Sequence, residues 1–176
     1  MKINAAVLEE LGKPLLLKSI DTAPLLPGQV LIKILYSGVC RSQLMEVKGK
    51  RGSDNWLPHL LGHEGSGIVQ AIGQGVKKIE VGDEVIVGWV KGDGMEAPGA
   101  KYKYDDQIIN SGCVTTFSNY SIISENRLVK KPISLPFDIA VLFGCALPTG
   151  AGMVLNELKP SSDLSIIVLG LGGIGL

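Results

Sequence analysis

The sequence predicts a mainly β domain that is followed by the beginning of an α/β unit. Short apolar segments separated by turn residues occupy the first 130 positions. Glycine accounts for 23 of the 176 residues, about twice the ~7% of average proteins, and this favours turns and bulges. After Pro136 the apolar spacing becomes helical, and an unbroken apolar segment then leads into a glycine-rich turn.

The expected strands lie between turn signals. Apolar residues alternate along residues 29–37 with a period of two, which is typical of a half-buried strand. A strand pair is expected on either side of the turn at residues 12–14, and glycines interrupt a strand region at residues 62–75. The expected strands are 4–8, 15–20, 29–37, a segment within 62–75, 81–87, 120–123 and 128–130.

Short helices are expected at residues 42–47, 136–143 and 149–158. Pro136 suits the first helical turn, where its missing N–H has no partner to lose, and Pro160 ends the last helix. The apolar run 164–169 that follows is typical of a buried parallel strand. Residues 91–112 are polar and show no period, so we expect a long surface loop there.

Composition excludes several function classes. Seventeen Lys and Arg residues balance seventeen Asp and Glu residues, whereas nucleic-acid binders and polybasic membrane modules carry excess positive charge. Three Cys residues are too few for a disulfide scaffold. The N-terminal residues lack the apolar core of a signal peptide, and residues 164–176 are shorter than the ~20 residues that span a bilayer. We therefore expect a cytoplasmic protein with no nucleic-acid or membrane partner.

The last glycines form the pattern G-x-G-x-x-G at Gly170, Gly172 and Gly175. After a strand, this pattern lets backbone N–H groups approach the pyrophosphate of a dinucleotide. The helix, second strand and acidic residue that would confirm the motif have no room before residue 176. A glycine-rich turn after a buried strand is therefore an equally open interpretation.

A small set of metal-binding residue types stands out. His59 and His63 are the only two histidines, and Cys40 and Cys145 are each placed at the end of a predicted element. One neutral imidazole and two thiolates would give Zn²⁺ three ligands and one open position, with no net charge. Zinc in such a site lowers the pKa of a bound alcohol. Taken singly, however, Cys most often packs as a small hydrophobe, and the spacing matches no local zinc motif.

Five short segments, which include Cys40, His63 and Cys145, occur in a particular order along the chain. Together the segments resemble the zinc-dependent medium-chain alcohol dehydrogenases, and the resemblance covers essentially the whole chain. It implies a GroES-like β-barrel catalytic domain with connecting helices over residues 1–160. It also implies that residues 161–176 are the first strand and glycine turn of an incomplete NAD(P)-binding Rossmann domain. The five segments are 38–42 (GVCRS), 62–67 (GHEGSG), 81–85 (VGDEV), 144–150 (GCALPTG) and 168–176 (VLGLGGIGL).

The resemblance implies a role for individual residues. Cys40, His63 and Cys145 match the ligands of one catalytic zinc, a ligand set that alcohol dehydrogenase itself exemplifies. Ser42 matches the hydroxyl residue that accepts the substrate proton, and Glu64 matches an acidic neighbour of the metal. The positions that match contacts to NAD or NADP are Arg41, Thr149, Gly170, Gly172 and Gly175.

The sequence also departs from the family pattern. Gln43 stands where a carboxylate commonly orients the ligand histidine, so the basicity of the imidazole should fall. Met45 stands where some members carry a proton-relay histidine, so the relay would end at Ser42 or continue through water. Many members hold a structural zinc with four closely spaced Cys, but residues 91–112 contain none, so no structural zinc is expected. Cys113 matches no ligand position.

The resemblance implies the catalytic part of a dehydrogenase that oxidises a small-molecule alcohol to an aldehyde or ketone by hydride transfer to NAD or NADP, or catalyses the reverse. We expect the chain to be part of a longer enzyme and to be inactive alone. We also expect a homo-oligomer, formed through the uncovered strand at residues 164–169, or disorder there. A non-catalytic GroES-like module with an empty metal site is the alternative. Zinc-free reductases of the same superfamily are disfavoured because they usually lack the three ligands together.

Overall fold

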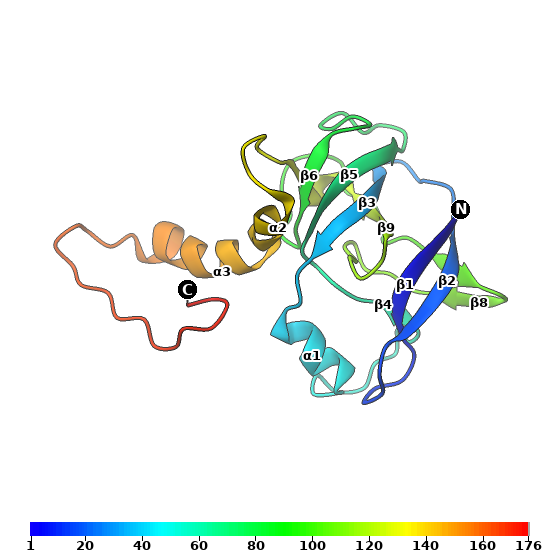
Figure 1. Ribbon diagram of the computed structural model, residues 1–176, viewed down its shortest axis with the longest axis horizontal. Coiled ribbons are helices and arrows are strands. Elements are labelled where there is room, and N and C mark those ends of the chain that lie inside the picture. The colour runs from blue at the N-terminus through cyan, green and yellow to red at the C-terminus, as the bar shows by residue number, and fades with distance from the viewer. Residues whose placement is uncertain (176) are drawn as a thin grey trace.

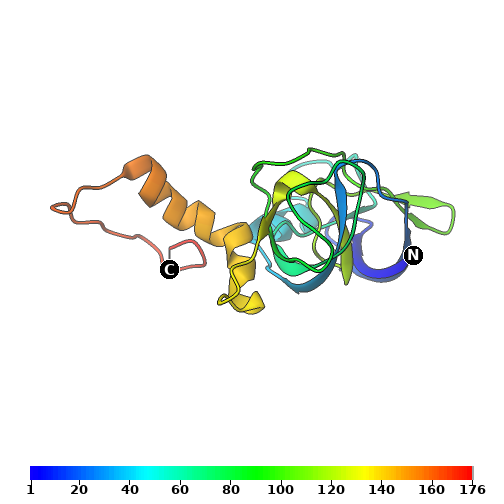
Figure 2. The same ribbon diagram turned by 90° about the horizontal axis from the view of Figure 1, so that it is seen from above.

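Two five-stranded sheets form the body of the protein in this computed structural model, which describes residues 1–175. The strand orders are β4-β1-β2-β7-β8 and β10-β6-β5-β3-β9. Figure 1 shows this β-rich body with a helical arm extending from it, and Figure 2 shows the strands curving around a shared interior. The strands are β1 (Lys2–Leu8), β2 (Leu16–Thr22), β3 (Gln29–Ser37), β4 (His59–Leu60), β5 (Gly65–Ile72), β6 (Glu84–Val87), β7 (Tyr102–Tyr104), β8 (Gln107–Ile109), β9 (Tyr120–Ser124) and β10 (Leu128–Lys130).

The period-two pattern of the strands builds the core. Along β1, Ile3, Ala5 and Val7 point inward and are almost fully buried, while the residues between them face out. In the second sheet, β3 is an interior strand and pairs antiparallel with both β5 and β9. Its residues Val30 and Ile32 are completely buried. The predicted strands of the barrel are thereby confirmed, with boundaries that differ by a few residues.

The prediction of a structureless loop at residues 91–112 is wrong. This segment contains the antiparallel hairpin β7–β8, in which Tyr102 pairs with Ile109. The hairpin turns at Asp105, whose φ of 50° is a left-handed conformation that Asp tolerates. Tyr102 is fully buried, and its hydroxyl oxygen accepts a hydrogen bond from the backbone N–H of Ile122. Three-residue strands are too short to show a clear period in sequence, which explains the miss.

The remainder of that segment is attached to the barrel by buried polar groups. The carboxylate of Glu125 accepts backbone hydrogen bonds from Lys77, Lys78 and Met95, each at 2.6 Å. The Ser124 hydroxyl accepts a hydrogen bond from Ala97 N–H at 2.8 Å. These contacts hold a long connection against the barrel through side chains of β9 and the turn after it.

The helices follow the prediction closely. Helix α1 (Arg41–Val47) leads away from β3, as expected. The later helical region consists of α2 (Phe137–Ala140), η2 (Val141–Gly144), α3 (Ala146–Gly152) and η3 (Met153–Leu158). Its second half begins at Ala146, three residues before the predicted start. Within residues 1–175, no single helix is long and apolar enough to cross a membrane, and only a joined pair with a 60° bend passes that test.

The predicted strand at residues 164–169 does not form. These residues are extended but pair with no other strand among the described residues, and most of their apolar side chains are exposed. A strand needs a neighbouring backbone to complete its hydrogen bonds, and none of the described segments provides one here. The chain turns back instead (Figure 1), so that the carbonyl of Ile174 lies against Gly150 of α3.

Candidate metal centre

Cys40 lies directly before α1, at the point where the chain leaves β3. Its backbone is extended, with φ of −89° and ψ of 150°, and this conformation carries the chain from the sheet into the helix. The preceding Gly38 donates a backbone hydrogen bond to the carbonyl of Glu64 at 3.2 Å. A Cβ at Gly38 would overlap the Glu64 carboxylate. A glycine at this position therefore allows the two segments to approach each other.

His63 lies in the short turn between β4 and β5. The preceding Gly62 has φ of 92°, a left-handed conformation that glycine adopts without strain. Thr116 packs over it so closely that a Cβ at Gly62 would overlap the Thr116 hydroxyl oxygen. The backbone N–H of Thr116 also donates to the carbonyl of Leu61 at 3.0 Å. These contacts fix the turn and with it the direction of the imidazole.

Cys145 joins η2 to α3, and its thiol is buried. Gly144 lies against the backbone of Val87 at the end of β6, where a Cβ would overlap the Val87 carbonyl oxygen. Trp89 N–H donates to the carbonyl of Gly144 at 3.4 Å. The start of α3 is therefore seated directly on the barrel, which brings Cys145 beside residues more than 80 positions earlier in the chain.

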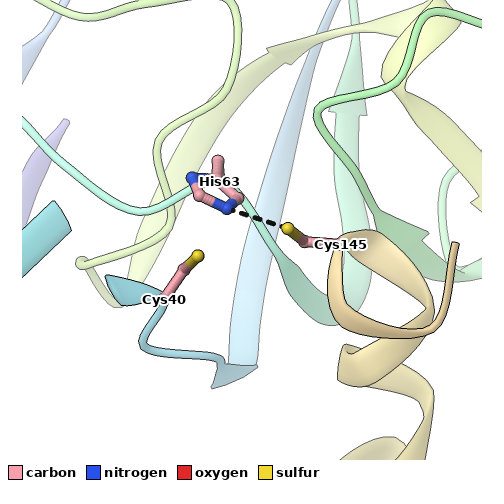
Figure 3. Close-up of side chains that lie close together, drawn as sticks. All are labelled: Cys40, His63 and Cys145. Atoms are coloured by element: carbon pink, nitrogen blue, oxygen red, sulfur yellow. Dashed lines mark hydrogen bonds between the residues drawn. The ribbon is translucent and has the colours of Figure 1, made fainter. Parts of the chain in front are cut away.

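The structure brings the three predicted ligands together. Cys40, His63 and Cys145 each present a ligand atom, and these atoms all lie within 4.8 Å of one another (Figure 3). His63 Nε2 is 3.2 Å from Cys145 Sγ. Tetrahedral zinc with ordinary Zn–S and Zn–N bonds separates its ligand atoms by about 3.5–3.8 Å. The donor set and its dimensions therefore fit one zinc ion, with small adjustments of the side chains.

The protonation states of these groups depend on burial. Burial lowers the pKa of His63, and the nearby Arg51 charge lowers it further, so the imidazole is neutral and able to donate a lone pair at pH 7. Burial raises the pKa of the Cys145 thiol, and the charge of Glu64 adds to the rise. A bound cation would reverse the effect on the thiol, because a metal deprotonates a coordinating thiol outright.

Gln43 contacts the ligand histidine from α1. Its side-chain amide is 2.5 Å from His63 Nδ1, and its Oε1 is buried without a hydrogen-bond partner. Metal binding through Nε2 requires the proton of His63 to be on Nδ1, where it must meet an acceptor. A half-turn of the planar amide places Oε1 opposite Nδ1 without changing the shape of the side chain. Gln43 can therefore orient His63 as a carboxylate would, but without the negative charge.

The two residues predicted to act in catalysis lie beside this cluster. The Ser42 hydroxyl oxygen is buried without a partner and lines the same cleft as the three ligands. Glu64 is buried on the other side, and its carboxylate accepts the Ala146 N–H at 3.3 Å. Burial raises the pKa of Glu64, although that hydrogen bond opposes the rise. Thr149 also lines the cleft, where its hydroxyl donates to the carbonyl of Cys145 at 2.7 Å.

The other residues predicted to bind a cofactor line a second cavity. Arg41 lies at this groove, which has a volume of about 860 Å³ and is also lined by Gly170, Gly172 and Gly175. Gly170 has φ of 100°, and Gly175 N–H donates to the carbonyl of Gly172 at 3.0 Å, so the glycines do form a tight turn. Cys40 and Cys145 border the groove as well, which places the glycine turn on the opposite side of the thiols from Ser42.

Comparison with known proteins now identifies the family. The family described as alcohol dehydrogenase GroES-like domain matches residues 26–133. The chain belongs to this family. S-(hydroxymethyl)glutathione dehydrogenase of a Synechocystis strain is 36% identical, over all of this chain and 54% of that protein. An Escherichia coli protein of the same name is 35% identical, with the same shares covered. The chain thus spans about half the length of the curated relatives it matches.

Solved structures agree with this placement. The crystal structure of benzyl alcohol dehydrogenase from Acinetobacter calcoaceticus is 28% identical, with a TM-score of 0.73 over 90% of this chain and 49% of that one. An alcohol dehydrogenase zinc-binding domain protein from Burkholderia ambifaria shares the fold, with a TM-score of 0.76 at 23% identity over 90% of this chain and 50% of that one. The resemblance to medium-chain alcohol dehydrogenases and the GroES-like fold are confirmed.

One part of this site was not predicted from the sequence. The cleft of about 670 Å³ that contains the three ligands continues to a wall of charged and aromatic residues. One signal was present, because Ser42 and Glu46 are four residues apart on a predicted helix and so share a face. The remaining residues lie in an irregular segment, residues 51–57, and at the start of the two-residue strand β4, whose folding the sequence does not show. The wall includes Glu46, Arg51, Asp54, Trp56 and His59.

Proposed function

We propose that this chain is the catalytic part of a zinc-dependent alcohol dehydrogenase, which oxidises an alcohol to an aldehyde or ketone or catalyses the reverse. The convergence of Cys40, His63 and Cys145 at one end of an open cleft carries the proposal. The names of the similar proteins, S-(hydroxymethyl)glutathione dehydrogenase and benzyl alcohol dehydrogenase, support the reaction class. Zinc would supply Lewis-acid polarisation of the substrate oxygen, and NAD or NADP would exchange hydride with the carbon.

Three residues near the candidate ligands would accept a proton, orient a ligand and position a helix. Ser42, whose hydroxyl oxygen has no partner within the described residues, is free to accept the substrate proton in the cleft. Gln43 would hold the imidazole of His63 in the orientation that metal binding requires. Glu64, buried beneath Cys145 and hydrogen-bonded to the first residue of α3, would keep that helix start in place.

The glycine turn and Arg41 would contact the cofactor from the groove side. In this chain the turn follows an extended segment that pairs with no strand among residues 1–175. We therefore expect the 176-residue chain to bind zinc but to show no turnover with NAD⁺ or NADP⁺. Oxidation of a primary or secondary alcohol by the isolated chain would contradict this expectation.

Metal content tests the proposal directly. Purified chain should contain about one zinc per molecule by mass spectrometry, and the Cys40→Ser variant should lose it because one of the three ligands is gone. Cys113→Ser is the matched control, since Cys113 is a free thiol outside the cluster. If the folded parent chain contains no zinc even after incubation with the metal, the non-catalytic module becomes the better explanation.

A further inference from the structure

A second cluster of metal-binding residue types contains no thiol and plays no part in the proposed zinc chemistry. Glu46, Asp54 and His59 each offer one ligand atom, and these atoms all lie within 4.8 Å of one another. The three residues come from separate parts of the backbone, namely α1, the irregular segment 51–57 and β4. Their side chains are 25%, 16% and 9% exposed. We call these three residues the carboxylate–histidine cluster.

The distances within the carboxylate–histidine cluster suit a metal ion. His59 Nε2 is 2.8 Å from Asp54 Oδ2 and 3.8 Å from Glu46 Oε1. A divalent metal with bonds of about 2.0–2.2 Å to nitrogen and oxygen separates neighbouring ligand atoms by about 3.0 Å in octahedral geometry and about 3.4 Å in tetrahedral geometry. The two observed distances lie on either side of these values. Small rotations of the side chains therefore bring the three atoms to coordinating positions.

A contact outside the cluster decides which ring nitrogen of His59 faces it. Nδ1 of His59 is 3.0 Å from the carbonyl oxygen of Leu60. Because a carbonyl only accepts, Nδ1 carries a proton whether the ring is neutral or charged, and Nε2 is the atom that faces the carboxylates. Metal-binding histidines are oriented in this way, by donating the other ring N–H to a carbonyl or a carboxylate. A metal ion at Nε2 displaces any proton there, so the assignment does not depend on the charge of the ring.

The two carboxylates are divided in the same manner. Asp54 Oδ1 accepts the backbone N–H of Trp56 at 2.8 Å, which leaves Oδ2 facing His59. Glu46 Oε2 lies 3.4 Å from the guanidinium of Arg51, which leaves Oε1 facing His59. The Arg51 side chain is 59% exposed, so solvent screens its charge. Each residue of the cluster thus uses one polar atom for an outside partner and turns the other toward a shared point.

We propose that Glu46, Asp54 and His59 form a second metal site, which takes a divalent transition metal of the Mn²⁺ type. Carboxylate oxygens suit Mn²⁺, and the imidazole favours a transition metal over Mg²⁺ or Ca²⁺. Two carboxylates also balance the charge of the ion. All three residues line the cleft, so water can fill the remaining coordination positions. A metal ion here would tie α1 and the irregular segment to β4, a role that goes beyond the proposed function and does not depend on it.

Mn²⁺ itself is the probe, because the electron paramagnetic resonance signal of its free aqua ion disappears on binding. The chain first receives one equivalent of zinc, which the thiolates of Cys40 and Cys145 take because they are the softer ligands. On titration with Mn²⁺ we then expect about one Mn²⁺ per chain. Asp54→Asn and Glu46→Gln should each weaken Mn²⁺ binding by roughly tenfold or more, because each removes one charged ligand and keeps the size of the side chain.

Glu10→Gln is the matched control, because Glu10 is exposed and lies outside the cleft. This variant should keep the Mn²⁺ affinity within about twofold. Either cluster variant suffices if the other does not fold. No uptake of Mn²⁺ at millimolar concentration, or uptake that the cluster variants leave unchanged, would overturn the site. Millimolar Mg²⁺ should leave the bound Mn²⁺ in place, and its ready displacement would overturn the role of His59 as a ligand.

The proposed function and the second metal site fail separately. The Cys40→Ser chain, given no zinc, should bind Mn²⁺ as tightly as the zinc-loaded parent, and loss of Mn²⁺ binding in this variant would place the ion at the thiols instead. A chain that holds zinc through Cys40 but takes no Mn²⁺ would retain the proposed function and lose the second site. A chain that binds Mn²⁺ through Asp54 but never holds zinc would retain the second site and lose the dehydrogenase.

Discussion

At the scale of single residues, one buried carboxylate holds together a region that the sequence analysis left without structure. Glu125 is 2% exposed and accepts hydrogen bonds from three backbone N–H groups. Burial alone would raise its pKa, but these hydrogen bonds outweigh burial and lower the pKa from its ordinary value near 4.5. Its charged form therefore stabilises the folded protein.

This arrangement predicts a pH-dependent cost for Glu125→Gln. At pH 7 the variant should lose about 1–3 kcal/mol of unfolding free energy, because its amide cannot accept all three hydrogen bonds. A carboxyl with a lowered folded pKa stabilises above its unfolded pKa and loses that effect as pH falls through the folded pKa. Urea unfolding at pH 7 and near pH 3 should thus show a smaller difference between parent and variant at the lower pH. A difference that grows on acidification would contradict this account.

Gln43 allows a second prediction at this scale. Gln43→Asp should raise zinc affinity by roughly tenfold, because a carboxylate that accepts the His63 Nδ1 proton increases the basicity of Nε2. Competition with a chromophoric zinc chelator would measure the change. Gln70→Asp, an exposed position on β5 outside the metal cluster, serves as the control for added negative charge. Equal affinities in the parent and Gln43→Asp would mean that this contact does not tune the metal.

At the scale of elements, the position of Cys145 in the candidate metal centre depends on how closely α3 packs against the barrel. A Cβ at Gly144 would overlap the carbonyl of Val87 and press on Glu64. Gly144→Ala should therefore cost about 1–3 kcal/mol of stability and displace Cys145, so that zinc content falls. Gly173→Ala should change neither quantity, since a Cβ there meets open space. Full zinc content in a stable Gly144→Ala variant would show that zinc binding does not depend on the close contact between the start of α3 and the barrel.

The elements also show where prediction from sequence succeeds. Strand β3 and helix α1 follow from local patterns, because alternation and helical spacing are visible within one segment. The three zinc-ligand candidates were named from residue type and family motifs, and the fold brings them together. The hairpin β7–β8 was missed because contacts such as that of Tyr102 with Ile122 are created by tertiary folding. The contact of Asp54 with His59 in the cleft was missed because it lies in an irregular segment that shows no period. The prediction of a strand at 164–169 was wrong because a strand forms only where a neighbouring segment accepts and donates its backbone hydrogen bonds.

At the scale of the whole molecule, the helical arm presents an apolar surface. Ile167, Leu169 and Leu171 are 84%, 93% and 72% exposed, and neighbouring side chains of η3 are exposed as well. An uncovered apolar segment of this kind favours contact with another chain. The chain should therefore self-associate with rising concentration in sedimentation experiments, whereas a version ending at Pro160 should sediment as a smaller species. Identical, concentration-independent behaviour of both would show that this surface stays uncovered.

The cleft and the groove described above share only two lining residues, Cys40 and Cys145. Two of the three candidate ligands thus lie at the boundary between the two cavities. Two small molecules, one in the cleft and one in the groove, could therefore be bound together, with only these two thiols in contact with both.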